Sequence, residues 1–152
     1  MPEEMPSQPL ALIADDDDEL RQMVSAVLRA AGFRTETFEN GKLLLQRALD
    51  DQAPPDVIVS DIDMPRMDGL TAITEIRKQS PQLPIILLSA IADAPRVVPT
   101  AKACGATLVI SKPVSLVELR RRIERVLNER GQDSKGAADP PGQHRMPDQP
   151  AC

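Results

Sequence analysis

The sequence predicts an α/β fold in which a doubly wound, five-stranded parallel sheet carries helices on both faces. Short apolar runs alternate with stretches that have hydrophobic residues at helical spacing, and this alternation occurs five times. Such a pattern is typical of parallel strands joined by right-handed crossover helices. The expected strands are LALIA (10–14), FRTETF (33–38), DVIVS (56–60), PIILL (84–88) and TLVI (107–110).

The composition of each run predicts its place in the sheet. Four of the five runs are continuously apolar, as expected of strands that are buried on both faces. The run 33–38 alternates between apolar and polar residues instead, so we expect it at an edge of the sheet.

Capping residues and glycines predict where the helices begin and end. The first helix has an apolar face of Leu20, Met23, Val24, Val27 and Leu28, and Gly32 ends it. We expect the second, third and last helices to be capped by Asn40, Asp68 and Ser115. The fourth helix should begin at or after residue 96, because Pro99 is tolerated only in a first turn, and should end near Gly105 after about two turns.

Length and composition indicate one domain. The chain has 152 residues, and we expect a folded body over 10–130 between disordered, Pro-rich segments at 1–9 and 131–152. A net charge of −5 and a single pair of aromatic residues, Phe33 and Phe38, argue against nucleic-acid binding. No run is long enough to span a membrane and no secretory signal is present, so we expect a cytoplasmic protein.

Polar side chains follow the predicted strands at the points where ligands bind in open parallel sheets. Asp15 and Asp16 follow the first strand and Asp61 follows the third. Ser89 follows the fourth strand and Lys112 follows the fifth. The sequence therefore predicts that carboxylates, a hydroxyl and an ammonium group converge on one edge of the sheet.

The charges of these groups do not balance. Asp15, Asp16 and Asp61 bring three negative charges and Lys112 brings one positive charge, which leaves −2. Carboxylates this close raise one another's pKa or require a cation. Mg²⁺ prefers oxygen ligands, usually one or two carboxylates with water and phosphate, and its charge would balance the group.

These residues resemble the response-regulator receiver family of two-component signalling. The resemblance rests on Asp15-Asp16, on the string DIDMPRMDG at 61–69, on Ser89-Ala90 and on Lys112-Pro113, in order and over roughly residues 10–128. It implies a flavodoxin-like fold with strand order 2-1-3-4-5. It also implies a signalling protein and not an enzyme, which accepts a phosphoryl group from a histidine kinase or a histidine phosphotransfer protein.

The resemblance also implies a role for each matching residue. Asp61 is expected to be the phosphoacceptor, while Ser89 and Lys112 contact phosphoryl oxygens. The implied Mg²⁺ ligands are Asp16, Asp61 and the backbone carbonyl of Asp63, with Asp15 acting through water. The bond between Lys112 and Pro113 is expected to be cis.

Some charged residues near these motifs have a simpler interpretation. Asp17 and Asp18 are expected to cap the first helix and to complement its dipole. The arginines of the last helix alternate with Glu118 and Glu124, and we expect them to form a solvated face; they are Arg120, Arg121, Arg122 and Arg125.

One position departs from the family pattern. Many receivers carry Tyr or Phe three residues before the site lysine, and this chain has Val109 there. A short, β-branched side chain cannot make the inward swing of an aromatic ring. We therefore expect activation to act through the loop 89–98 and the short fourth helix.

Three functions from different classes fit the motifs to different degrees. We expect a stand-alone receiver, monomeric or weakly dimeric when phosphorylated, that acts on an unknown downstream protein by phosphorylation-dependent binding or by phosphorelay. The receiver part of a DNA-binding regulator is the alternative, although only 40 residues follow Lys112 and no helix-turn-helix is expected in them. A haloacid-dehalogenase-type phosphatase also uses Asp-x-Asp after a strand, but it expects Thr or Val where this chain has Pro65, and an acidic pair downstream.

Overall fold

The computed structural model describes residues 8–136. Strands and helices alternate along this part of the chain in the predicted order. The elements are β1 (Leu10–Ala14), α1 (Asp18–Ala30), β2 (Arg34–Phe38), α2 (Gly41–Ala48), β3 (Val57–Asp61), α3 (Gly69–Gln79), β4 (Ile85–Ser89), α4 (Val97–Cys104), β5 (Leu108–Ser111) and α5 (Leu116–Gly136).

The outer parts of the two segments that we expected to be disordered, 1–7 and 137–152, lie outside the described residues. Helix α5 continues to Gly136, past the boundary expected at residue 130. At the other end, the carbonyl oxygen of Pro9 accepts a hydrogen bond from the backbone N–H of Arg34 at 2.8 Å. Among the helices of residues 8–136, none combines the length and the apolar character needed to cross a membrane.

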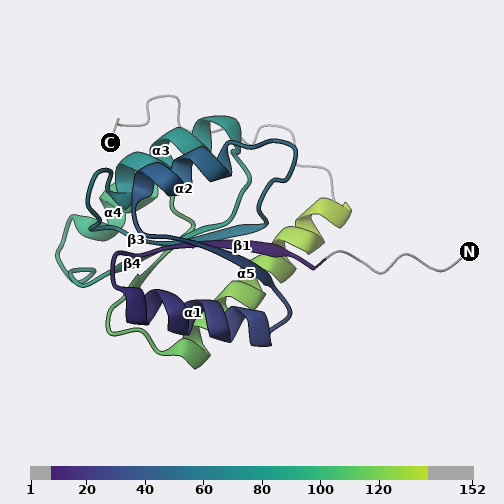
Figure 1. Ribbon diagram of the computed structural model, residues 1–152. Coiled ribbons are helices and arrows are strands. Elements are labelled where there is room, and N and C mark those ends of the chain that lie inside the picture. The colour runs from purple at the N-terminus through teal and green to yellow at the C-terminus, as the bar shows by residue number, and fades with distance from the viewer. Residues whose placement is uncertain (1–7, 137–152) are drawn as a thin grey trace, which may run out of the picture.

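The sheet is parallel throughout, with strand order β2-β1-β3-β4-β5. Figure 1 shows α1 and α5 on one face of the sheet and α2, α3 and α4 on the other. The predicted fold, strand order and edge position of β2 are therefore confirmed.

Four strands begin and three end one residue later than the apolar runs suggested. The shift is clearest at β4, which begins at Ile85, because Pro84 has no N–H to donate and contributes only its carbonyl oxygen, to Ile58. As a result Asp61 and Ser89 are the last residues of β3 and β4 and do not lie in the loops that follow. Two of the candidate site residues are thus held by the sheet itself.

The core is aliphatic, as the shortage of aromatic residues predicts. It consists of two clusters, one on each face of the sheet, and every residue of β1, β3 and β4 is buried. Strand β5 was expected to be equally buried, but it is the second edge strand and is only partly covered.

Four of the predicted N-caps are confirmed, whereas Asp18 is the first residue of α1, where it can complement the helix dipole, and not its cap. The carboxylate of Asp17 accepts hydrogen bonds from the backbone N–H groups of Glu19 and Leu20, which makes Asp17 the N-cap of α1. Asn40, Asp68 and Ser115 accept the corresponding hydrogen bonds at the starts of α2, α3 and α5.

Helix α4 has the start and the short length that Pro99 and Gly105 predict. It begins after Arg96, so Pro99 falls in its first turn, and it ends at Gly105, whose φ of 118° is left-handed. Arg96 provides no side-chain cap to this helix.

Two glycines hold the loop between β3 and α3 against the site. A Cβ atom on Gly69 would lie 2.2 Å from the carbonyl oxygen of Asp61, and one on Gly41 would lie 2.3 Å from that of Met67. The N–H of Gly69 donates to the carbonyl of Ile62 at 2.7 Å, which closes the loop. A side chain at either position would push the loop away from the end of β3.

We expect Gly69→Ala to lower the free energy of unfolding by about 3 kcal/mol, because the new methyl group meets backbone atoms that cannot rotate away. The control is Gly32→Ala. Gly32 has φ of 101°, and among the described residues no atom beyond Gly32 and its chain neighbours lies within 4 Å of the place that its new methyl group would take, so that variant should lose only about 1 kcal/mol. Urea unfolding of the two variants measures both values, and equal losses would contradict the close approach at Gly69.

Candidate functional site

Three carboxylates gather at the carboxyl edge of the sheet. Asp15, Asp16 and Asp61 each present an oxygen atom, and these atoms lie within 4.8 Å of one another. Asp15 and Asp61 are buried, with 2% and 5% of their surface exposed, whereas Asp16 is exposed. The predicted convergence of these three residues is therefore present in the structure.

The register of the sheet brings the carboxylates together. In the pairing of β1 with β3, Ala14 lies opposite Ser60. The next residue along the chain is an aspartate in both cases: Asp15 directly after β1, and Asp61 at the end of β3. The N–H of Asp15 still donates to the carbonyl of Phe38 at 3.1 Å, which extends the hydrogen bonding of the sheet to the site. Strand pairing alone thus places Asp15 beside Asp61.

Lys112 supplies the positive charge that the sequence predicts at this edge. Its Nζ atom lies 3.1 Å from Oδ2 of Asp61 and 3.3 Å from Oδ2 of Asp15. Its backbone N–H donates to the carbonyl of Ser89 at 2.9 Å, and the Lys112–Pro113 bond is cis, as expected. The ammonium group therefore bridges two carboxylates that face each other.

Asp15 is held through one oxygen and leaves the other poorly satisfied. Its Oδ1 atom accepts a hydrogen bond from the N–H of Asp17 at 2.9 Å. Its Oδ2 atom is buried and, among the described residues, receives no hydrogen bond beyond its ion-pair contact with Lys112. A buried anionic oxygen in this state favours a further cation, and an all-oxygen donor set suits Mg²⁺. The residues present therefore fit the metal that the sequence suggests.

Burial and the neighbouring charges shift the pKa values of Asp61 and Lys112. Burial raises the pKa of Asp61 to about 6, and the charge of Asp15 adds to this, although Lys112 and the N–H of Asp63 act in the opposite direction. Burial by itself lowers the pKa of Lys112, but its contacts with Asp61 and Asp15 outweigh burial and leave that pKa raised. Both shifts mean that the site holds protons more tightly than its isolated groups would.

Ser89 lies at the end of β4, next to the carboxylates. The register pairs Asp61 with Leu88, and Ser89 is the next residue, with 2% of its surface exposed. Its Oγ atom accepts a hydrogen bond from the N–H of Ile91 at 3.0 Å. Its expected contact with a phosphoryl oxygen stays a prediction.

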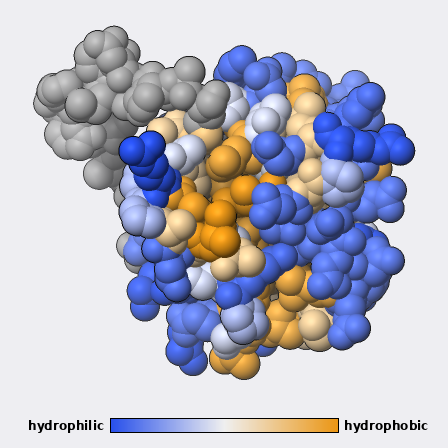
Figure 2. Space-filling view, turned by 90° about the vertical axis from the view of Figure 1, so that its left-hand side faces the viewer, coloured by the Kyte–Doolittle hydropathy of each residue, from blue (hydrophilic) through white to orange (hydrophobic). Residues whose placement is uncertain are grey.

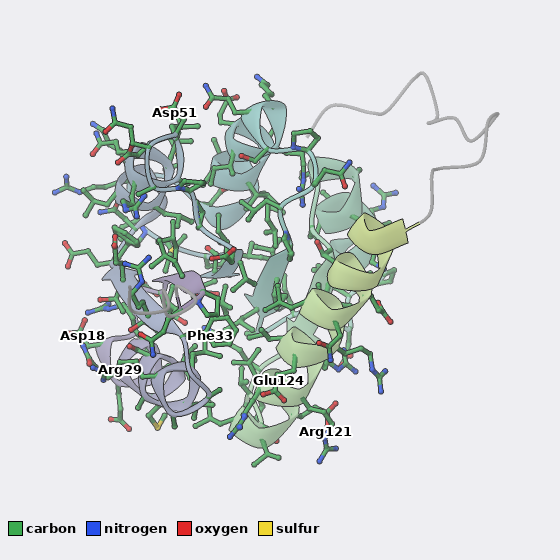
Figure 3. The ribbon with its side chains drawn as sticks, turned by 90° about the vertical axis from the view of Figure 1, so that its right-hand side faces the viewer. Asp18, Arg29, Phe33, Asp51, Arg121 and Glu124 are labelled. Carbon is green, nitrogen blue, oxygen red and sulfur yellow. The ribbon has the colours of Figure 1, made fainter. Side chains whose placement is uncertain are left out.

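The remaining predicted residues divide into a backbone contributor and a surface group. The N–H of Asp63 contacts the carboxylate of Asp61, its side chain is exposed, and the metal-binding role of its carbonyl stays a prediction. The α5 arginines form the expected solvated face, with ion pairs from Arg120 to Glu124 and from Arg121 and Arg122 to Glu118. Figure 3 shows Arg121 at the outer surface of this helix.

Three contacts near the site had no sequence signal specific enough to reveal them. The buried hydroxyl of Ser60 donates to the carbonyl of Asp61 at 2.9 Å. Gly69 permits the loop to approach that same carbonyl. The guanidinium group of Arg21 donates to the carbonyl of Asp15 at 2.7 Å. Only the i,i+3 spacing of Asp18 and Arg21 indicated an ion pair, and it did not reveal the contact with Asp15.

Comparison with known proteins agrees with this arrangement. The sequence profile of the response regulator receiver domain family matches residues 11–124, which include Asp15, Asp16, Asp61, Ser89 and Lys112. The chain belongs to the response-regulator receiver family. A receiver is a domain of two-component signalling, so the phosphatase alternative has no support from the family match.

The relatives with similar sequences include regulators that are longer than this chain. The chain is 39% identical over 116 residues to the regulatory protein AtoC of Escherichia coli K12, and it is 32% identical over 133 residues to the transcriptional regulatory protein PrrA of Mycobacterium leprae. These alignments cover 76% and 88% of this chain but only 24% and 56% of the relatives. The chain therefore spans about a quarter of the length of AtoC.

This chain matches almost the whole length of solved receiver structures. The chemotaxis protein CheY4 of Vibrio cholerae has a TM-score of 0.72 and 35% identity, and the match covers 79% of this chain and 99% of that one. The receiver domain of the Francisella response regulator 1452 has a TM-score of 0.71 and 31% identity, and the match covers 80% of this chain and 98% of that one. The receiver fold of the present chain is thus shared with both of these proteins.

We expect Asp61→Asn to stabilise the metal-free protein at pH 7.5 by about 2–3 kcal/mol, because one pKa unit corresponds to about 1.4 kcal/mol and the pKa of Asp61 rises from 3.8 to about 6. A raised pKa means that the folded wild type takes up its proton more readily than the unfolded chain. The wild type therefore loses stability relative to the variant as the pH rises from about 4 to about 6, and the gap stays constant above that range.

Urea unfolding in chelator at pH 4 and pH 7.5 measures this difference. The matched control is Asp17→Asn, because asparagine caps a helix as well as aspartate does and Asp17 is exposed. A gain for Asp61→Asn that is the same at both pH values, or a loss at pH 7.5, would show that the carboxylate is not strained by its surroundings.

Proposed function

We propose that this chain accepts a phosphoryl group on Asp61 from the phosphohistidine of a histidine kinase or a histidine phosphotransfer protein. The observation that supports this most directly is the buried carboxylate of Asp61, at the rigid end of β3, with Nζ of Lys112 at 3.1 Å. Membership in the receiver family supports a histidine kinase as the donor.

The proposed transfer is a substitution at phosphorus. An oxygen atom of Asp61 forms a bond to phosphorus, the bond from phosphorus to the histidine nitrogen breaks, and the histidine leaves. The product is an acyl phosphate with a charge of about −2 in place of −1. Lys112 lies where it offsets part of this charge, and Ser89 follows Leu88, the residue that the sheet register places opposite Asp61.

The proposed metal is Mg²⁺. Asp16, Asp61 and the backbone carbonyl of Asp63 would hold it, with Asp15 acting through a water molecule. When bound, Mg²⁺ neutralises negative charge and orients the phosphoryl oxygens. The poorly satisfied Oδ2 atom of Asp15 supports a cation at this place.

We propose that the phosphorylated receiver signals through contact with a downstream protein, in the cytoplasm, as a monomer or a weak phosphorylation-dependent dimer. Two forms of the protein remain candidates, a stand-alone receiver and the receiver part of a longer regulator, since AtoC and PrrA are longer than this chain. The size of the protein in its host cells, measured by immunoblotting with an antibody to this chain, distinguishes the two.

Three features favour the segment 89–104 as the part that responds to phosphorylation. Helix α4 has no side-chain cap at its start, but at its end the Nε of Arg77 donates to the carbonyl of Gly105 at 3.1 Å. A hollow of about 200 Å³ lies between Ser89, the start of α4 and the beginning of α3, and apolar side chains line most of it. Ile91 lines this hollow and is 58% exposed. Figure 2, which views the molecule from the left-hand side of Figure 1, shows apolar surface in the middle of that side. We therefore propose that the start of α4 moves while its end stays fixed.

The phosphotransfer itself gives the direct test. Wild-type protein with Mg²⁺ should take up labelled phosphate from a phosphorylated kinase or a small phosphodonor, and Asp61→Asn should not, because the nucleophile is absent. Asp17→Asn should label like the wild type, since Asp17 caps α1 and lies outside the carboxylate cluster. Full labelling of Asp61→Asn, or of wild type in excess chelator, would overturn the proposal.

The proposed response of α4 is tested by NMR with and without a phosphoryl mimic. Backbone amides of 89–100 should shift more than those of 101–105, because Arg77 ties the end of α4 to α3. Arg77→Gln should remove this contrast, while Lys78→Gln, an exposed neighbour, should preserve it. Unchanged signals over 89–100 together with large shifts on another face would refute this route.

A further inference from the structure

Arg21 is a second positively charged residue beside the carboxylates. It contacts the backbone of the loop between β1 and α1, and not the carboxylate groups of the site. It lies in the second turn of α1, and only 12% of its side chain is exposed. Its Nη1 atom donates to the carbonyl oxygen of Asp15 at 2.7 Å. Its Nη2 atom pairs with the carboxylate of Asp18, which is 81% exposed.

The contact of Arg21 restrains the peptide group that joins the two acidic residues. The carbonyl of Asp15 belongs to the same planar unit as the nitrogen of Asp16, so fixing that carbonyl fixes the direction in which Asp16 leaves the strand. Asp15 is restrained at its carboxylate as well, by the N–H of Asp17. The side chain of Asp16 is exposed, and no hydrogen bond to it is found among the described residues, so the peptide orientation matters most for this residue.

Arg21 occupies none of the carboxylate oxygens of Asp15, Asp16 and Asp61. Arg21 donates to a backbone carbonyl and to Asp18, and Asp18 is not one of the clustered residues. An arginine that donated directly to Asp15 or Asp16 would compete with a metal ion for the same lone pairs. Arg21 therefore adds positive charge and order without occupying a ligand atom.

We propose that Arg21 is a positioning residue for metal binding, which presents Asp15 and Asp16 in the orientation that Mg²⁺ requires. This inference rests on the proposed metal site. It also predicts the direction in which the affinity for Mg²⁺ changes when Arg21 is replaced. Loss of positive charge near the site by itself would tighten the binding of a cation, whereas loss of the peptide restraint would weaken it.

The test is the affinity of the folded, metal-free protein for Mg²⁺ alone, measured by calorimetry well below the melting temperature. Arg21→Gln should bind about tenfold more weakly, as variants of residues that orient metal ligands typically do. Arg21→Lys keeps the charge but lacks the planar fork that reaches both partners, so its affinity should fall by about two- to threefold. Arg29→Gln is the matched control, since Arg29 is exposed in the last turn of α1, at the opposite end from the site, and should bind like the wild type.

The outcomes separate this inference from the proposed metal site. A wild type without saturable Mg²⁺ binding, or Asp16→Ala with wild-type affinity, overturns the metal site itself. If the wild type binds Mg²⁺ saturably and Asp16→Ala binds it more weakly, unchanged or tighter binding by Arg21→Gln overturns the role of Arg21. A purely structural role is also excluded by the readout, because it would lower the melting temperature in chelator without changing the affinity of the folded protein. Should Arg21→Gln fail to fold, Arg21→Lys decides, and wild-type affinity in that variant overturns the inference.

Discussion

The crowding of negative charge at the carboxyl edge of the sheet dominates the chemistry of this protein. Asp15 and Asp61 are adjacent because β1 and β3 are paired, and this pairing fixes the backbone positions from which both side chains project. Lys112 offsets only part of their charge, and burial prevents water from screening the remainder. The metal-free site is therefore unfavourable by itself, and it gains stability from whatever cation or proton it binds.

The backbone around the site keeps this unfavourable arrangement in place. The loop after β3 is pressed against the strand because Gly69 has no side chain, and the loop after β1 is restrained from both sides by Asp17 and Arg21. Backbone hydrogen bonds of 2.7–3.1 Å hold these loops, whereas Oδ2 of Asp15 receives no hydrogen bond from the described residues. These restraints act mainly on the backbone of the loops, so carboxylate oxygens of the site stay available to a metal ion or a phosphoryl group.

Much of this could be predicted from the sequence because it depends on local patterns. Apolar runs located the strands to within about a residue, and short polar residues such as Asn40 and Asp68 marked helix starts. The positions of Asp15, Asp61 and Lys112 followed from one rule, that the carboxyl ends of parallel strands meet. What could not be predicted depends on contacts between distant parts of the chain. The partial burial of β5, the approach of Gly69 to Asp61 and the bond from Arg77 to Gly105 require the folded structure to be known.

The two core clusters meet only across the backbone of the sheet, and this has a consequence for how the protein can change. Side chains under α1 and α5 pack with one another, and those under α2, α3 and α4 form a separate layer. A substitution that enlarges or shrinks one layer can be compensated within that layer alone. The surface above each face can therefore diversify independently during evolution, while the strands between them keep the same aspartates in register.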